Sequence, residues 1–145
     1  MPRKCSNTDK RGPWIRRVLP SELERIREAE GEVLGRLGEL GYGEDDRFAV
    51  RLALEEALVN AMKHGNRMDA SRRVRVAYRA SAEQVEIHVA DEGEGFDPAQ
   101  VPDPTADENL SKPSGRGIML MRCYMDEVTY VCEGREVHMV KYRRA

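Results

Sequence analysis

Apolar and polar positions alternate with a period of two in two neighbouring segments, 72–78 (RRVRVAY) and 84–90 (QVEIHVA). This alternation is typical of half-buried strands, and the short connection 81–83 predicts that the two strands pair in an antiparallel hairpin. A shorter apolar segment, 14–19 (WIRRVL), predicts one more strand, which ends at Pro20.

The C-terminal third of the chain predicts a helix followed by a closing hairpin. Segment 115–125 (GRGIMLMRCYM) has helical character and is opened by glycines. Segments 127–133 (EVTYVCE) and 136–142 (EVHMVKY) lie on either side of Gly134 and predict two strands joined by a turn.

Two longer segments show apolar residues at helical intervals. The first follows Ser21–Glu24 (SELE), which has the spacing of a capping box. It contains several glycines, and its apolar positions are Leu23, Ile26, Val33, Leu37 and Leu40. The second and stronger helix runs from Asp45 to His64, with Gly65 as a plausible C-terminal stop.

The helix 45–64 is apolar around most of its circumference, which predicts that it is largely buried. One side is formed by Phe48, Leu52, Val59 and Met62. Arg51 and Glu55 lie at i, i+4 and are expected to pair with each other. Glu56, Asn60 and His64 form a separate polar strip at i, i+4, i+8. These three side chains either hydrogen-bond neighbouring loops or line a pocket for a cation and a polar ligand, since Asn offers an oxygen for Mg²⁺ and Glu can act as a base.

The composition is that of one cytosolic domain. A chain of 145 residues with a net charge of −2 indicates neither a basic nucleic-acid surface nor a second domain. Cys5, Cys123 and Cys132 have neither paired nor metal-ligand spacing, which favours reduced thiols in the cytoplasm. No apolar segment approaches the roughly 20 residues of a membrane span. Residues 1–12 are polar and basic and are expected to form a flexible tail before a single domain, 13–145.

Two glycine-containing motifs flank a proline-rich segment, 97–114, of the kind that is usually functional in a compact domain. In the first motif, DEGEGFDP, Asp91, Gly93 and Gly95 follow one another at two-residue spacing. The glycines permit close approach of a ligand, and Asp91 can accept a hydrogen bond from an amine. The second motif, SGRG at 114–117, opens a helix and favours an anion such as phosphate. Each motif alone is more often just a turn; together they suggest adenine at one end and phosphates at the other.

The three motifs together resemble the GHKL ATPases, the superfamily of gyrase B, Hsp90, histidine kinases and MutL. EALVN at 56–60 is similar to the N-box, DEGEG at 91–95 to the first glycine box, and GRG at 115–117 to the second. The flanking residues resemble most closely the anti-sigma-factor serine kinases of bacterial stress and sporulation switches, over about residues 14–142.

This resemblance implies roles for individual residues. Asn60 matches the Mg²⁺-binding Asn, and Glu56 matches the general base or water-positioning acid. Asp91 matches the acid that reads the adenine amino group, in a pocket shaped by Gly93 and Gly95.

The resemblance implies that the second glycine box forms the phosphate-binding end of the site. The resemblance places Lys112, Ser114, Gly115, Arg116 and Gly117 around the triphosphate, with the two glycines wrapping it. His64 lies one turn beyond Asn60 and contacts either the nucleotide or the protein. Segment 96–114 is expected to act as a lid.

One position departs from the family pattern. Well-known members carry a basic residue directly before the Ser-Gly of the second box, where this chain has Pro113. Lys112 or Arg116 is left to supply the charge for the γ-phosphate.

The resemblance implies an α+β fold of two layers, a mixed and mainly antiparallel sheet with helices on one face, known as the Bergerat fold. It implies an ATP- and Mg²⁺-dependent serine kinase that phosphorylates a STAS-type antagonist and binds a sigma factor. Nucleic acid and membrane are not expected as partners. A homodimer is expected, because the strand 14–19 leaves an edge that can pair.

Two alternatives remain. The first is an ATP-gated protein-binding regulator without kinase activity. The second is an interaction domain that binds no nucleotide and has chance glycine turns. The presence of Glu56 favours the kinase over the ATP-gated regulator. Binding of ATP with Mg²⁺ would favour the kinase over the interaction domain that binds no nucleotide.

Overall fold

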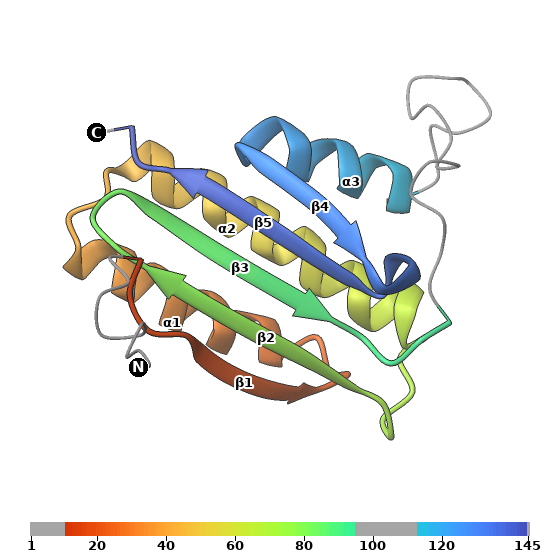
Figure 1. Ribbon diagram of the computed structural model, residues 1–145. Helices are drawn as coiled ribbons and strands as arrows, with labels where there is room; N and C mark the ends of the chain where they lie inside the picture. Colours follow the sequence, from red (N-terminus) through yellow and green to blue (C-terminus); the bar gives the residue numbers. More distant parts are fainter. Residues whose placement is uncertain (1–10, 95–112, 145) are drawn as a thin grey trace, which may run out of the picture.

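A computed structural model describes residues 11–94 and 113–144. In these segments helices cover one face of an open sheet (Figure 1). The strands are β1 (Ile15–Pro20), β2 (Arg73–Ala80), β3 (Gln84–Ala90), β4 (Glu127–Val131) and β5 (Glu136–Tyr142). The helices are α1 (Arg25–Glu39), α2 (Glu44–Val59) and α3 (Pro113–Tyr124), with a π-helix, η2 (Asn60–Gly65), and a short 3-10 helix, η5 (Cys132–Gly134).

The sheet has five strands in the order β1-β2-β3-β5-β4, and every pairing between them is antiparallel. Both hairpins expected from the alternating pattern, β2 with β3 and β4 with β5, are confirmed. The last strand lies inside the sheet, between β3 and β4 (Figure 1). The two-layer α+β class with helices on one face is therefore confirmed, but the sheet of the described residues is wholly antiparallel and not mixed as expected.

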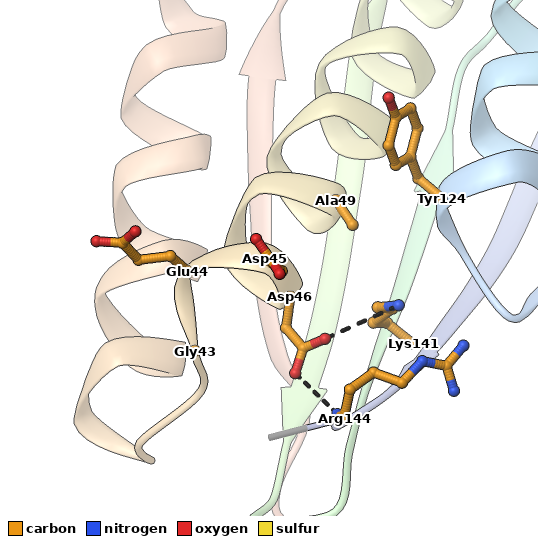
Figure 2. A pocket seen from close by; sticks show the side chains of 8 residues that line it. All are labelled: Gly43, Glu44, Asp45, Asp46, Ala49, Tyr124, Lys141 and Arg144. Atoms are coloured by element: carbon orange, nitrogen blue, oxygen red, sulfur yellow. Dashed lines mark hydrogen bonds and ion pairs between the residues drawn. The ribbon is translucent and has the colours of Figure 1, made fainter.

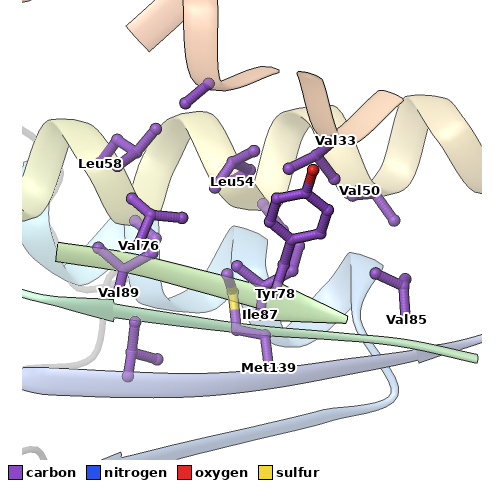
Figure 3. Packing of buried hydrophobic residues seen from close by; sticks show 14 of the residues in the cluster. Val33, Val50, Leu54, Leu58, Val76, Tyr78, Val85, Ile87, Val89 and Met139 are labelled. Atoms are coloured by element: carbon purple, nitrogen blue, oxygen red, sulfur yellow. The ribbon is translucent and has the colours of Figure 1, made fainter. Parts of the chain in front are cut away.

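The strand period determines which residues form the core. On β3, Val85, Ile87 and Val89 face the helices and are at most 2% exposed, while Glu86 and His88 between them point to the open face. Figure 3 shows these residues packing with apolar side chains of α1 and α2. The core thus fixes the register of the sheet, because a slip of one residue would turn the buried side chains to solvent.

Helix α1 begins without the capping box expected at Ser21–Glu24. The helix starts at Arg25, and its N-cap residue, Glu24, makes no side-chain cap hydrogen bond. Ser21 is buried, and its hydroxyl donates to the carbonyl of Arg72 at 2.8 Å. This expectation was wrong because a partner distant in sequence, at the start of β2, binds the Ser hydroxyl.

The buried side of helix α2 is not the side on which Phe48 lies. Its buried apolar residues are Ala49, Val50, Ala53, Leu54, Ala57 and Leu58. Phe48 is 49% exposed and makes an edge-to-face contact with Tyr124 of α3, with their ring centroids 6.2 Å apart. The helix is apolar on several sides, and the positions of α1, α3 and the sheet decide which of them is covered.

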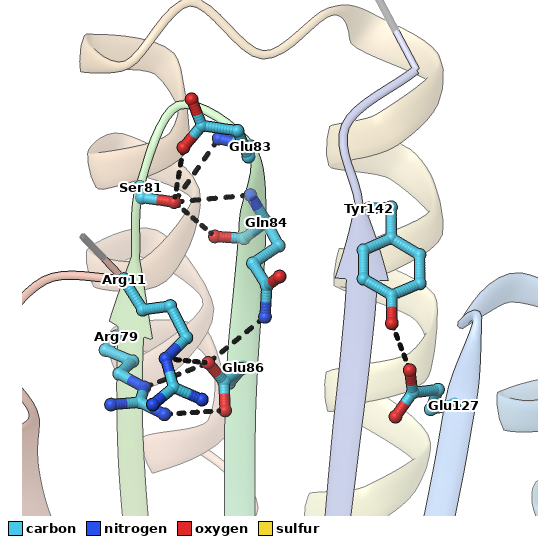
Figure 4. A network of polar contacts seen from close by, with 8 residues as sticks. All are labelled: Arg11, Arg79, Ser81, Glu83, Gln84, Glu86, Glu127 and Tyr142. Atoms are coloured by element: carbon cyan, nitrogen blue, oxygen red, sulfur yellow. Dashed lines mark hydrogen bonds and ion pairs between the residues drawn. The ribbon is translucent and has the colours of Figure 1, made fainter. Parts of the chain in front are cut away.

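The open face of the sheet carries charged and aromatic side chains (Figure 4). Arg79 on β2 donates from Nε and Nη2 to the two carboxylate oxygens of Glu86 on β3, at 2.9 and 3.1 Å. The guanidinium of Arg79 also lies over the ring of Trp14, 4.4 Å from its centroid. Such a paired and stacked arginine satisfies the buried Glu86 carboxylate.

None of the helices among the described residues combines the length and the apolar character that a bilayer crossing requires.

Candidate functional site

The N-box residues lie where helix α2 changes its winding. The α-helix ends at Val59, and the π-helix η2 begins at Asn60, where the expected α-helix would have continued to His64. The N–H of Asn66 donates to the carbonyl of Ala61 at 2.8 Å, a π-type bond across five residues. Single π turns within longer helices are frequent at functional sites.

The change in winding separates His64 from the strip that the sequence predicts. Glu56 and Asn60 are still joined by an α-helical bond from the Asn60 N–H to the Glu56 carbonyl, so they share one face. Both are half-buried, whereas His64 is exposed. A π turn holds more residues than an α turn, so the interval of four residues between Asn60 and His64 no longer aligns them.

The neighbouring acids of α2, Glu55 and Glu56, have different surroundings. Burial raises the pKa of Glu56, and the nearby charge of Glu55 raises it further. Glu55 does not form its expected pair with Arg51 in the structure; it hydrogen-bonds the carboxyl group of Glu30 on α1. Arg51 instead lies over the ring of Phe48, 6.0 Å from its centroid. The expected pairing was wrong because α1 packs against this side of α2 and presents another acid.

Asp91 and Gly93 lie directly against the end of the π-helix. A Cβ atom on Gly65 would lie 2.2 Å from a carboxylate oxygen of Asp91, and a Cβ on Gly93 would lie 2.0 Å from the Gly65 carbonyl oxygen. Asp91 accepts a hydrogen bond from the Gly93 N–H at 2.8 Å. Only glycine at both positions permits this approach, which joins the first glycine box to the helix that carries Asn60.

The carboxyl group of Asp91 is half-buried, and burial raises its pKa. The Gly93 N–H and the positive charges of Arg135, Arg72 and Arg75 act in the opposite direction. A half-buried acceptor is suited to a ligand amine, because the bond forms partly away from bulk water.

Asn66 is a structural residue of this site that the sequence reasoning missed. It is fully buried, and its side-chain amide donates to the Ser21 hydroxyl and to the Arg73 carbonyl, each at 3.0 Å. Its side-chain oxygen accepts the N–H of Glu92 at 2.7 Å. Asn66 therefore ties the end of η2 to β1, β2 and the first glycine box. Its place directly after Gly65 was the only signal in the sequence.

The second glycine box lies in helix α3. Positions 114–117 fall in its first turns, as expected, and α3 packs against α2 and η2. Figure 1 shows that the beginning of α3 lies at the same end of the molecule as η2 and the end of β3. The backbone of all three motifs therefore converges there. Gly95, Lys112 and most of the expected lid, 96–112, lie outside the described residues, and the side chains of Ser114 and Arg116 are likewise not described.

A pocket of about 660 Å³ lies at the other end of α2 (Figure 2). Its lining includes Asp46, Tyr124, Lys141 and Arg144. Asp46 is buried, accepts the Arg144 N–H at 2.8 Å and lies 3.9 Å from the Lys141 ammonium. None of the residues expected to bind nucleotide lines this pocket.

The site offers donors and acceptors that suit a magnesium nucleotide. Asn60 presents a neutral amide at the α–π junction, and amide oxygens are common ligands of hard cations. Glu56, on the same face, is a carboxylate whose pKa is raised toward neutrality by burial, a property of general bases. The first N–H groups of an α-helix have no partner within the helix, so the start of α3 favours an anion.

Comparisons with known proteins identify the family of the chain. A family model described as a histidine kinase-like ATPase domain matches residues 19–141. The chain is 30% identical over 138 residues to the serine-protein kinase RsbW of Bacillus licheniformis, covering 89% of this chain and 85% of that protein. RsbW of Bacillus subtilis matches with the same identity and coverage.

Two further similarities cover less of the other protein. The serine/threonine-protein kinase BtrW of Bordetella bronchiseptica is 31% identical over 86 residues, which is 58% of this chain and 61% of BtrW. A solved structure of the RsbU and RsbW domains of a Mycobacterium tuberculosis protein superimposes with a TM-score of 0.59 at 19% identity, over 91% of this chain and 32% of that one. This neighbour supports the fold. With the family model and the RsbW similarity, the chain belongs to the histidine kinase-like ATPases of the GHKL superfamily, close to the anti-sigma-factor serine kinases.

Proposed function

We propose that this protein is an ATP- and Mg²⁺-dependent serine kinase that phosphorylates a STAS-type antagonist and sequesters a sigma factor in the cytoplasm. The observation that carries the proposal is the position of Glu56, a half-buried acid with a raised pKa on the same helical face as Asn60. The similarity to RsbW and BtrW, both named as protein kinases, supports the same activity.

Each motif has one task in the proposed reaction. Asp91 accepts a hydrogen bond from the adenine amino group, and Asn60 would hold the Mg²⁺ that neutralises phosphate charge. Glu56 takes the proton of the attacking serine hydroxyl. Its raised pKa strengthens it as a base at neutral pH, because a general base is most effective when its pKa is near the working pH.

Phosphoryl transfer needs few side chains, since positioning and charge stabilisation supply most of the rate enhancement. The N–H groups at the start of α3 cradle the phosphates, together with Ser114, Gly115 and Gly117. Lys112 or Arg116 supplies positive charge to the γ-phosphate.

An ATP-gated binding regulator without kinase activity is the second candidate. Pro113 favours it, because this position carries a basic residue in well-known members of the family. A missing charge at the γ-phosphate would lower transfer more than binding.

The test is transfer of labelled phosphate from γ-labelled ATP to a STAS-domain protein recovered with this chain from native cells. Incorporation on serine, with Mg²⁺ present and not with EDTA, is expected. Binding of ATP and of the partner without phosphate transfer would identify the binding regulator. Absence of ATP binding would contradict both the kinase and the binding regulator. Recovery of an RNA polymerase sigma subunit in the ATP-bound state tests the second half of the proposal.

A further inference from the structure

The open face of the sheet holds a group of side chains that the kinase site does not use. His88 on β3 and His138 on β5 occupy directly paired positions, and their rings stack with centroids 3.6 Å apart and planes inclined by 15°. Glu136 precedes His138 by two residues on the same strand, so both point to the same face. A carboxylate oxygen of Glu136 lies 2.5 Å from Nε2 of His138.

We propose that His88, Glu136 and His138 form a binding site for a divalent transition metal of the zinc class. One ligand atom from each residue lies within 4.8 Å of the others, and no other group of three His, Cys, Asp or Glu residues in segments 11–94 and 113–144 does so. Three protein ligands leave a fourth tetrahedral position to water or to a group from outside.

The required adjustment is small. Donor atoms of a tetrahedral zinc site lie about 3.3 Å apart, as zinc–nitrogen bonds of about 2.0 Å dictate. Rotation of the imidazole rings about their side-chain bonds would bring the donor atoms from within 4.8 Å of one another to this spacing, and the metal would replace the bond between Glu136 and His138 Nε2. The backbone register holds the three residues on adjacent strands.

The surroundings leave the site open to an ion. The side chains of His138 and Glu136 are 32% and 26% exposed, enough for an ion to enter from the open face. Arg79 is occupied by its paired bonds to Glu86.

The ligand set separates this site from the nucleotide site. Two imidazoles and one carboxylate suit Zn²⁺, Ni²⁺ or Cu²⁺, whereas Mg²⁺ prefers oxygen ligands alone and keeps several waters. Figure 1 shows that the helices cover one face of the sheet. His88 alternates with the core residues Ile87 and Val89 on β3, so its side chain lies on the opposite face. It therefore depends on neither ATP nor the proposed kinase reaction.

Trp14 provides a direct reporter of this site. It is the only tryptophan of the chain, and its ring centroid lies 4.5 Å from that of His88. Ni²⁺ held by His88 should therefore quench the fluorescence of Trp14. The three cysteines are replaced by serine for this experiment, because Cys123 and Cys132 are free, exposed thiols that also bind soft metals.

The experiment titrates this full-length Cys-to-Ser chain with Ni²⁺ by fluorescence and with Zn²⁺ by calorimetry, without nucleotide. One ion per chain and quenching of Trp14 are expected. His138→Gln should weaken the affinity at least about 100-fold and Glu136→Gln at least about tenfold, because loss of a ligand costs no less than loss of an outer-shell partner, which costs about 10–100-fold. His64→Gln is the matched control, since it removes the third histidine of the chain from another part of the molecule and should leave metal affinity unchanged.

Circular dichroism of each variant distinguishes loss of a ligand from loss of the fold. Absence of Zn²⁺ and Ni²⁺ binding to the parent chain would overturn the proposal. So would an affinity unaltered by folded His138→Gln and His88→Gln variants, or one lost with His64→Gln alone.

Discussion

Glu55 and Glu56 are adjacent in sequence, yet the fold gives their carboxyl groups different partners. Glu56 shares a face with Asn60, the face on which we propose that the catalytic base lies. Glu55 points to α1 and hydrogen-bonds Glu30. The angle of about 100° between successive helical residues is sufficient to separate the proposed catalytic environment from a packing environment.

Glu56→Gln should retain ATP binding and lower phosphoryl transfer roughly 10²–10⁴-fold, the range for a positioned acid–base group. Glu55→Gln is the matched control and should leave the transfer rate within a few-fold of wild type. The measurement is labelled γ-phosphate transfer to the antagonist at saturating ATP. An inactive Glu55→Gln beside an active Glu56→Gln would show that the base has been placed on the wrong residue.

Asp91→Asn should weaken ATP binding while the fold is retained. The Asn oxygen can still accept the Gly93 N–H, but the charge is lost and an acceptor is replaced by a donor. Loss of a charge-assisted hydrogen bond suggests roughly 1.5–3 kcal/mol of binding free energy.

Calorimetry with ATP and Mg²⁺ measures this change. Glu92→Gln is its control, since the Glu92 carboxylate accepts the N–H of Arg73 at 2.7 Å and takes no part in the proposed adenine contact. Unchanged affinity in Asp91→Asn would remove Asp91 from the nucleotide site.

At the scale of the elements, two acidic side chains, Glu30 of α1 and Glu55 of α2, lie close together where the two helices pack. Glu30 is 7% exposed, and one of its carboxylate oxygens is buried without a hydrogen-bond partner. Burial raises its pKa to about 7, and the hydrogen bond and charge of Glu55 contribute, against the positive charges of Arg51 and Arg27. The helices therefore pack best when one proton is held between the two carboxyl groups.

This pair predicts a loss of stability with rising pH. A carboxyl group whose pKa is higher in the folded than in the unfolded chain binds more protons when folded, so the free energy of unfolding falls as pH rises from about 4.5 to about 7. Glu30→Gln should remove this decline and raise the free energy of unfolding above pH 7 by about 1–3 kcal/mol.

Urea unfolding at pH 5, 6 and 8 measures the effect. Glu28→Gln is the control, because Glu28 lies on the exposed side of α1 and pairs with Arg25. Equal pH dependence in wild type and Glu30→Gln would mean that the buried acid is not protonated in the folded chain.

At the scale of the whole molecule, the sheet order leaves β1 at one edge. Its residues are mostly exposed, and Val18 is 55% exposed. An edge strand with free N–H and C=O groups can pair with another chain. We therefore expect a homodimer in which β1 takes part.

Sedimentation at micromolar concentration measures the association directly. Val18→Lys, on the exposed side of this edge strand, should weaken it, whereas Leu23→Lys, an exposed apolar position before α1, should not. A single 16.5 kDa species for the wild-type chain would contradict the expectation.

Local signals account for most of the secondary structure and for the order of the motifs. Strand alternation and turn residues predict both hairpins, and apolar spacing predicts α1, α3 and the α-helical part of α2, whereas the π-helix Asn60–Gly65 was not predicted. The spacing of Glu56 and Asn60 also needs nothing beyond helical geometry, so their common face was predictable.

The contacts between side chains depend on how the helices and strands pack together. Ser21 binds Arg72, Glu55 binds Glu30, and Asn66 joins three separate strands and loops, each through a partner distant in sequence. The π turn that separates His64 from Asn60 and the stacking of His88 on His138 likewise depend on packing between elements. The local sequence pattern determines the direction in which a side chain projects from its helix or strand. The packing of the elements determines which groups that side chain contacts.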